Sequence, residues 1–493
     1  MPGKYPKRGS ASYLFSIVLV AVLGGLLFGY DTAVISGAEK GLQAFFMGAK
    51  DFAYSDFLHG LTTSSALIGC IIGSALSGLM SARMGRKKSL FVAGVLFFLS
   101  ALGSYNPEFL FFPKGEPSFN LLIAFNLYRI LGGVGVGLAS AICPMYIAEV
   151  APADRRGVLV SWNQFAIIFG QLVVYFVNFL ILGQHANPVV DLVNGVNQVI
   201  NPEASAWTAA TGWRLMFVSE AVPAALFAIL ILLVPETPRY LVLNGQDEKA
   251  LMVLSKVNGE ERGMSILAAI KGTATAKTEK LFTFGWMVIF VGIMLSVFQQ
   301  AIGINAVLYF APRIFESMGM GSPMAYTVLM GVVNITFTLV AIMTVEKIGR
   351  KPLLIWGSIL MAVGALGVAF SNLVTVPALV PVISILIYSA SFMFSWGPIC
   401  WVLISEIFPN TIRSHATAIA VAFQWIFNFI VSSTFVPMYN MRVGEMGVKF
   451  GHFTAYAIYG VICIIAAVFV WKLVPETKGK TLEEMSRLWK RKD

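Results

Sequence analysis

Long apolar stretches recur along the whole chain and are separated by shorter polar segments. An α-helix needs about 20 apolar residues to cross the hydrocarbon core of a membrane, and twelve stretches meet that need. They are residues 13–37, 58–80, 89–106, 119–141, 158–183, 215–234, 282–310, 325–345, 352–372, 377–403, 414–437 and 453–474. The pattern therefore predicts an all-α membrane protein with twelve transmembrane helices.

The composition excludes the soluble classes of protein. Of the 493 residues, 57% are hydrophobic and only 12% are charged, whereas a soluble domain has about 25% charged residues. The net charge of +10 comes from short, scattered basic groups, which does not indicate nucleic-acid binding. The sequence shows no metal-ligand cluster, phosphate-binding loop or dinucleotide motif. We therefore expect no enzyme activity, no cofactor and no metal ion, and a lipid bilayer as the environment.

Lysine and arginine are divided unevenly between the two sides of the predicted spans. With the N-terminus inside, 27 of these 35 residues fall in inner segments and seven in outer loops, and Arg129 lies within a span. Inner loops of membrane proteins carry such an excess. The bias predicts a multi-pass protein of the cell (inner) membrane with both termini in the cytoplasm. We expect it to function as a monomer.

One long polar segment, residues 235–281, divides the spans into six and six. The halves share motifs at matching loops, since Pro235-Glu-Thr follows span six and Pro475-Glu-Thr follows span twelve. Two six-helix pseudo-repeats with a substrate held between them are typical of transporters. The expected parts are an N-terminal six-helix bundle (1–234), a cytoplasmic linker with short helices (235–281), a C-terminal six-helix bundle (282–474) and a cytoplasmic tail (475–493).

Charged residues also repeat at the inner ends of the spans. Glu149 and Arg156 follow span four as Glu406 and Arg413 follow span ten, each pair 257 residues apart. Basic clusters that only keep loops inside the cell would not need the paired glutamates. We therefore expect a cytoplasmic latch of ion pairs that forms in one conformation and breaks in the other. Its expected members are Arg83, Arg86, Glu149, Arg156, Arg350, Glu406 and Arg413.

Three charged residues lie within the predicted spans: Asp31, Arg129 and Glu220. A charge at the bilayer centre costs at least about 2.5–3.5 kcal/mol, so it pairs, faces water or takes part in function. The rise along each helix places all three at overlapping depths. An arginine between two carboxylates suits proton coupling, because protonating one carboxylate frees the arginine for the other. A static ion pair that only holds helices together is the alternative.

Amide and aromatic side chains gather in spans five, seven, ten and eleven, and Gly303 is expected to loosen span seven so that Asn305 turns inward. Amides donate and accept hydrogen bonds, which suits a ligand with neighbouring hydroxyl groups, and aromatic rings suit the apolar face of a sugar. Hydrogen bonding between helices is the alternative for any single amide. As a set, these residues indicate a neutral polyol substrate: Gln164, Gln171, Gln299, Gln300, Asn305, Tyr309, Phe392, Trp396, Gly397, Trp401, Gln424, Trp425 and Asn428.

Several motifs together resemble the sugar porter family of the major facilitator superfamily, over essentially the whole chain. The motifs are Gly-Arg-Lys at 85–87 and 349–351, Arg129-Ile-Leu-Gly-Gly133, Pro235-Glu-Thr-Pro-Arg239, Gln299-Gln300 with Asn305, Ser405-Glu-Ile-Phe-Pro409 and Pro475-Glu-Thr-Lys-Gly479. Residues 23–37 and 163–171 are most similar to bacterial D-xylose:proton symporters. One departure is Ala82, where the family usually has an acidic residue before the first basic loop.

The resemblance implies proton-coupled import of D-xylose by alternating access, with a monosaccharide and a proton as the transported partners. It implies that Asp31 carries the proton, with Arg129 and Glu220 as its partners. It also implies a sugar site built from Gln164, Gln299, Gln300, Asn305, Trp401 and Gln424 and lined by Phe28, Tyr309, Phe392, Gly397 and Trp425. A symporter for glucose, galactose or arabinose, or a facilitator that needs no proton, remains the alternative. The preference for a pentose rests on the resemblance alone.

Overall fold

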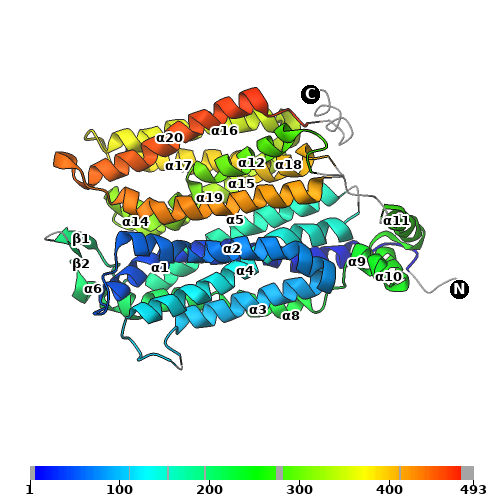
Figure 1. Ribbon diagram of the computed structural model, residues 1–493, viewed down its shortest axis with the longest axis horizontal. Helices are drawn as coiled ribbons and strands as arrows, with labels where there is room; N and C mark the ends of the chain where they lie inside the picture. The colour runs from blue at the N-terminus through cyan, green and yellow to red at the C-terminus, as the bar shows by residue number, and fades with distance from the viewer. Residues whose placement is uncertain are drawn as a thin grey trace.

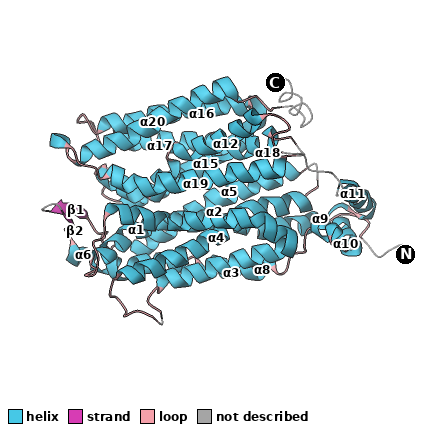
Figure 2. Cartoon of the chain, in the orientation of Figure 1, coloured by secondary structure: helices cyan, strands magenta, loops and turns pink. Residues whose placement is uncertain are grey.

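The computed structural model describes residues 6–109, 111–152, 155–193, 196–273, 281–409 and 412–478. Within these ranges twelve helical segments are long and apolar enough to cross a membrane, and the strands form only a short hairpin (Figure 2). The predicted all-α membrane class is therefore confirmed. Most of the predicted tail, from residue 479 on, lies outside the described residues.

The first half contains six spans, and short helices follow them in the linker. The spans of this half are α1 (Ala11–Met47), α2 (Asp56–Met84), α3 (Arg86–Tyr105), α4 (Phe119–Val150), α5 (Arg156–Leu182), and a sixth made of α6 (Pro202–Trp207), a π-helical turn (Thr208–Gly212), α7 (Trp213–Val218) and α8 (Ala221–Ile231). The loop after α5 forms the antiparallel hairpin of β1 (Val190–Val193) and β2 (Val196–Val199). The linker contains α9 (Pro238–Leu243), α10 (Asp247–Asn258) and α11 (Glu260–Thr273).

Two of the six spans in the second half are interrupted. Its helices are α12 (Trp286–Ala301), α13 (Ile304–Tyr309), α14 (Ala311–Ser317), α15 (Pro323–Ile348), α16 (Arg350–Ser371), α17 (Leu379–Phe394), α18 (Trp396–Ile407), α19 (Arg413–Tyr439) and α20 (Val448–Leu473). Span seven comprises α12 and α13, and span ten comprises α17 and α18. A 3-10 turn (Gly444–Met446) precedes α20.

The two halves lie side by side along the length of their helices (Figure 1). They meet where α2 packs on α19 and where α5 packs on α15. The linker helices α9, α10 and α11 lie at one end of the molecule, and the β1–β2 hairpin and α6 lie at the opposite end. The linker end is the side predicted to be cytoplasmic, so below we call it the inner end and the hairpin end the outer end.

Small residues let helices approach closely. A side chain at Gly73 of α2 would collide with the backbone of Val134 in α4, and one at Gly133 of α4 would collide with the backbone of Ala66. Such contacts replace the hydrophobic driving force that helices lack in lipid. They fix α2 against α4, and α4 carries Arg129.

Span seven is broken at Gly303, as expected from its sequence. The residue has φ of +93° between α12 and α13, a left-handed conformation that glycine adopts without strain. The ring of Tyr459 also fills the space where a β-carbon would lie. The break separates Gln299 and Gln300 from Asn305 while keeping all three on one side of the span.

The first helix is longer than its apolar stretch. The predicted span ends at residue 37, whereas α1 continues to Met47. The additional turns contain Glu39, Lys40 and Gln43, all of which are buried. These polar side chains stay inside because residues of the second half pair with them.

Candidate functional site

A cavity of about 70 Å³ lies between the two halves. All eleven residues of the predicted sugar site line it: Phe28, Gln164, Gln299, Gln300, Asn305, Tyr309, Phe392, Gly397, Trp401, Gln424 and Trp425. They come from α1 and α5 of the first half and from α12, α13, α17, α18 and α19 of the second. Segments distant in sequence therefore assemble one polar and aromatic cavity.

The cavity also has lining residues that the predicted sugar site did not include. Gln171 and Asn428 belonged to the set of residues that indicated a polyol substrate but not to the site that the resemblance implied, and the remaining five carried no sequence signal because they are ordinary span residues. The full set is Thr32, Ile167, Ile168, Gln171, Leu308, Met393 and Asn428.

The amides on one side of the cavity form a hydrogen-bonded chain. Asn305 Nδ2 donates to Gln300 Oε1 at 2.6 Å, and Gln300 Nε2 donates to Gln299 Oε1 at 3.4 Å. Gln299 Nε2 in turn donates to the carbonyl oxygens of Trp396 and Gly397 at 3.1 and 3.3 Å. The chain fixes the orientation of each amide and anchors it to the break between α17 and α18.

Three other buried polar atoms of the cavity lining have no hydrogen-bond partner among the described residues. They are Gln171 Oε1, Gln424 Oε1 and Trp425 Nε1. Burial of such atoms is unfavourable unless something satisfies them. Two acceptors and one donor match a ligand whose hydroxyl groups both donate and accept.

Aromatic rings close the cavity between the halves. The rings of Phe28 in α1 and Trp425 in α19 lie 5.6 Å apart, centroid to centroid. Tyr175 Oη of α5 donates to the carbonyl oxygen of Leu308 in α13 at 3.2 Å. A bound molecule would therefore contact both halves at once.

The three charged residues predicted within the spans lie together in the first half. Arg129 Nη1 donates to Asp31 Oδ1 at 2.7 Å, and its Nη2 donates to the carbonyl oxygen of Asp31 at 3.2 Å. The guanidinium carbon lies 4.9 Å from the ring centroid of Phe217. Glu220 is fully buried, and Asp31 and Arg129 are the charged groups that act on it.

This cluster contains one arginine for two carboxyl groups. Asp31 Oδ2 and both carboxyl oxygens of Glu220 have no donor among the described residues. Since two carboxylates without enough donors are costly to bury, the arrangement is suited to holding a proton. Helix α1 links this cluster to the cavity, because Thr32 and Phe28 on the same helix line the cavity.

At the inner end, the same cluster is built twice. In the first half, Arg86 Nη2 pairs with Glu149 at 2.7 Å, and Glu236 accepts the backbone N–H groups of Arg86 and Lys87 at 3.0 and 3.1 Å. A carboxylate at the beginning of a helix satisfies free N–H groups and favours the helix dipole. Glu236 thereby ties the end of span six to the start of α3.

The second half repeats this arrangement. Arg350 Nη2 pairs with Glu406 at 2.9 Å, and Glu476 accepts the backbone N–H groups of Arg350 and Lys351 at 3.1 and 2.9 Å. Glu406 also accepts a hydrogen bond from Thr477 Oγ1 at 2.6 Å. The repeated Pro-Glu-Thr motif had indicated a duplicated chain, but its capping role was not predicted.

Four of the seven expected latch residues, Arg86, Glu149, Arg350 and Glu406, therefore pair within their own half in this structure. Arg83 and Arg156 are exposed at the inner end, and the side chain of Arg413 lies outside the described part. The ion pairs that join the two halves, among described residues, lie at the outer end instead. They involve Glu39 and Arg313, which the sequence had not singled out.

Comparisons with known proteins agree with this arrangement. The family model described as "Sugar (and other) transporter" matches residues 17–489. The chain is 49% identical to the D-xylose-proton symporter of Escherichia coli K12, over 97% of this chain and 96% of that protein. It is 35% identical to the glucose facilitated diffusion protein of Zymomonas mobilis, over 98% and 99% of the two chains.

A solved structure is similar over nearly the full length. The inward open conformation of the xylose transporter XylE from E. coli has 46% sequence identity and a TM-score of 0.83, covering 97% of this chain and 100% of that one. With the matching family model, this similarity confirms the resemblance inferred from the motifs. The chain belongs to the sugar transporter family of the major facilitator superfamily.

Proposed function

We propose that this protein imports D-xylose together with a proton across the bacterial inner membrane. The observation that carries the proposal is one cavity, lined by amides and aromatic rings of both halves, that shares helix α1 with the Asp31–Arg129–Glu220 cluster. Similarity to a D-xylose-proton symporter at 49% identity supports both the sugar and the coupling. Transport, not chemical conversion of the sugar, is the expected outcome.

The sugar would bind through the amides and rings of the cavity. Its hydroxyl groups would satisfy Gln171, Gln424 and Trp425, whose polar atoms have no described partner, and would bond to the oriented amides of Gln299 and Gln300. The C–H face of the sugar would pack on the aromatic rings. Because the lining comes from both halves, binding would draw the halves together.

The proton would act through the bond between Arg129 and Asp31. When the carboxylate of Asp31 accepts a proton from the outer side, it loses its negative charge, and its ion pair with Arg129 weakens. Arg129 would then favour the carboxylate of Glu220. Movement of α1 relative to α4 would carry this change to Phe28 and Thr32 in the cavity.

The two halves would then rock about the bound sugar, open the inner side and release both substrates there. One proton crossing about 100 mV supplies about 2.3 kcal/mol, and each pH unit adds about 1.36 kcal/mol. This energy is enough to accumulate a neutral sugar against its gradient. The inner-end residues Arg83, Arg86, Glu149, Arg156, Arg350, Glu406 and Arg413 would act as the latch: contacts that they make between the halves while the inner side is closed would break in this step.

The excess of inner Lys and Arg supports an orientation with both termini in the cytoplasm. Each half contributes to a single central cavity within one chain, which supports a monomer as the transporting unit.

A facilitator without proton coupling is the second candidate, favoured by the similarity to a glucose facilitated diffusion protein. The buried Asp31 argues against it, because a carboxylate paired with Arg129 has no evident purpose in a site for a neutral sugar. The test is uptake of radiolabelled D-xylose into proteoliposomes with an imposed inward proton gradient.

We expect accumulation that a protonophore abolishes and that unlabelled xylose, but not glucose, arabinose or galactose, outcompetes. Equilibration without accumulation would identify a facilitator. Accumulation of a different sugar would support proton-coupled transport but identify that sugar, and not D-xylose, as the substrate.

A further inference from the structure

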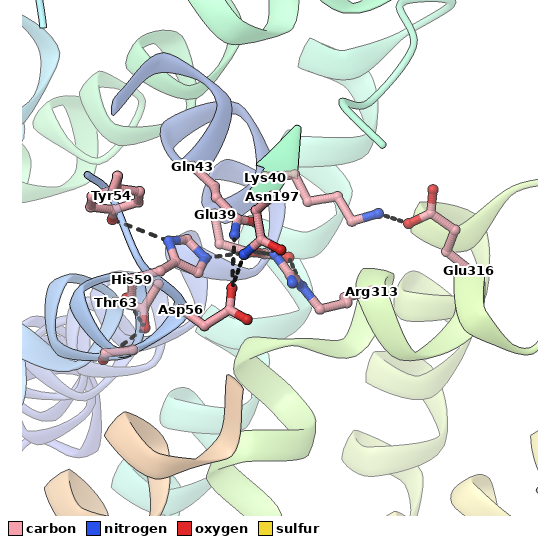
Figure 3. A network of polar contacts seen from close by, with 11 residues as sticks. Glu39, Lys40, Gln43, Tyr54, Asp56, His59, Thr63, Asn197, Arg313 and Glu316 are labelled. Atoms are coloured by element: carbon pink, nitrogen blue, oxygen red, sulfur yellow. Dashed lines mark hydrogen bonds and ion pairs between the residues drawn. The ribbon is translucent and has the colours of Figure 1, made fainter. Parts of the chain in front are cut away.

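The outer end of the molecule contains a buried network of charged side chains that joins the two halves (Figure 3). Arg313 of α14 binds Glu39 of α1 through two bonds, Nη2 to Oε2 at 2.6 Å and Nε to Oε1 at 3.1 Å. Arg313 Nη2 also donates to Gln43 Oε1 at 2.6 Å. Lys40, the next residue of α1, pairs with Glu316, which lies about one turn after Arg313 on α14.

Glu39 is satisfied on every side. Its side chain is 0% exposed, and besides Arg313 it has a contact of 2.9 Å from Oε2 to His59 Nε2 of α2. The ring of His59 is held in turn by Tyr54 Oη at 3.2 Å from Nδ1. The first half thus positions Glu39 firmly, and the second half supplies the arginine.

We infer that the ion pairs Glu39–Arg313 and Lys40–Glu316 form an outer latch that holds the halves together while the cavity faces inward. The latch must break whenever the outer side opens to admit sugar. This inference rests on the proposed transport by alternating access. It assigns gating roles to four residues that touch neither the sugar cavity nor the proton cluster.

The positions of the partners explain how such a latch would be linked to the site. Glu39 lies eight residues after Asp31 on α1, about 12 Å along the helix. Arg313 lies in α14, the helix that follows α13 in the chain, and residues Asn305 and Tyr309 of α13 line the cavity. The latch therefore connects the helix that carries the proton site to the segment that carries the sugar site.

The β1–β2 hairpin at the outer end also contacts both halves. Asn197 Nδ2 of the β1–β2 hairpin donates to Asp56 of the first half at 3.0 Å, and Asp191 of the hairpin pairs with Arg442 of the second half at 2.5 Å. A cavity of about 390 Å³ lies between the hairpin and the latch. The hairpin, for which the sequence suggested no role, bridges the halves above the latch.

The energetics favour a reversible latch. A bidentate Arg–carboxylate pair is among the stronger ion pairs, yet opening would transfer both partners to water and would not leave either one buried alone. Removing a single partner by mutation is different, because the other charge then remains buried and unpaired in the closed state. Such a mutation should shift the equilibrium toward the outward-open state.

The test measures the distance between the outer ends of the halves in the full-length protein in lipid nanodiscs. Spin labels on Lys50→Cys and Gly321→Cys report it, since both residues are exposed and belong to different halves, and the four native cysteines are buried. We expect Glu39→Gln to increase the outward-open population about tenfold. A distance distribution identical to that of the labelled native sequence would overturn the inference.

A matched control exists within the first half. Glu108 and Arg214 also form a buried bidentate pair near the outer end, but both belong to the same half. Glu108→Gln should lower thermal stability without changing the distance between labels. An equal shift in this variant would show that loss of any buried charge opens the protein, and would overturn the specific role of the latch.

Charge reversal supplies a second test that does not depend on Glu39→Gln folding. Lys40→Glu places a negative charge opposite Glu316 and should open the outer side, and Lys40→Glu combined with Glu316→Lys should restore the short distance. Failure of the double variant to restore the short distance would refute the latch.

The latch and the proposed function can fail separately. If the native protein shows no sugar uptake at all, the proposed function fails, whereas unchanged distances in a transporting protein refute only the latch.

Discussion

The two six-helix halves are alike at their inner ends and different in the membrane interior. At the inner end, Arg86, Glu149 and Glu236 of the first half have the same mutual contacts as Arg350, Glu406 and Glu476 of the second. These contacts join the ends of three spans within a half. The repeated motif therefore stabilises each half as a unit that can move as one body.

In the interior, the first half contains the buried charges and the second contains most of the amides. Asp31, Arg129 and Glu220 all belong to the first half, whereas Gln299, Gln300, Asn305 and Gln424 belong to the second. The halves share a scaffold but divide the work of proton coupling and sugar recognition. If this division is correct, a substitution in one half should abolish one of these two functions and leave the other function intact.

The largest effect is expected from Asp31→Asn in the first half. Asparagine cannot take up a proton, so the sugar gradient would lose its link to the proton gradient. One proton per sugar sustains about tenfold accumulation for each pH unit of gradient. We expect the ratio of internal to external xylose to fall to unity, while counterflow exchange persists, as measured in proteoliposomes.

The control for this variant is Asp51→Asn, which removes an aspartate from the outer loop of the same half, where it accepts a hydrogen bond from the backbone of Phe119. It should accumulate xylose as the native protein does. Concentrative uptake by Asp31→Asn would refute the division between the halves, because the proton would then travel elsewhere.

An intermediate effect is expected from Gln299→Ala in the second half. The change breaks the amide chain and its anchor on Trp396 and Gly397. Loss of one or two hydrogen bonds in a buried site costs about 1–3 kcal/mol, so we expect xylose binding to weaken about tenfold or more. Isothermal titration of the purified protein measures it.

Asn334→Ala offers a matched loss of a buried amide in the same half. Asn334 Oδ1 accepts a hydrogen bond from Ser389, and the residue does not line the sugar cavity. This variant should lose thermal stability and keep its affinity. Unchanged affinity in Gln299→Ala would instead remove the amide chain from the proposed site.

Much of this arrangement was accessible from the sequence because polar groups in a membrane are costly. The apolar lengths predicted all twelve spans, and the rarity of charges in them singled out Asp31, Arg129 and Glu220. Amides in spans indicated the cavity, although their grouping into a sugar site came from the family resemblance. The break in span seven followed from Gly303, because a residue with a side chain would be strained at this positive φ.

The outer contacts were not accessible in the same way. Glu39 and Arg313 are 274 residues apart and lie at the ends of their spans. Water normally solvates charges there, so a charged residue at such a position is not unusual and gives no signal in the sequence. Their burial depends on how one half is oriented against the other. Likewise, Pro235-Glu-Thr was seen to repeat, but the N–H groups that Glu236 caps lie about 150 residues earlier.

The smallest effect is expected from the two capping glutamates, Glu236 and Glu476. They occupy matching positions in the two halves, but their pKa values are shifted in opposite directions. Burial raises the pKa of Glu236 above its usual value, and the backbone N–H groups of Thr237, Lys87 and Arg86 only partly oppose this. Burial also acts on Glu476, but bonds from four backbone N–H groups outweigh it and lower its pKa. The inner ends are therefore alike in contacts and opposite in proton linkage.

The sign of each effect follows from linkage. Charged Glu476 stabilises the folded state above the ordinary glutamate pKa of 4.5, and this contribution disappears as the pH falls through the lowered pKa. In contrast, charged Glu236 lowers the stability of the folded state above its raised pKa, and protonation relieves this cost as the pH falls toward 4.5.

Glu476→Gln should therefore lower the melting temperature at pH 7 by about 1–2 °C and have no effect in acid. The difference between the native protein and Glu236→Gln should change in the opposite direction over the same pH range, measured by tryptophan fluorescence in detergent. Parallel curves for the two variants would mean that the inner ends are equivalent in charge as well as in structure, and the distinction between the halves would then be confined to the membrane interior.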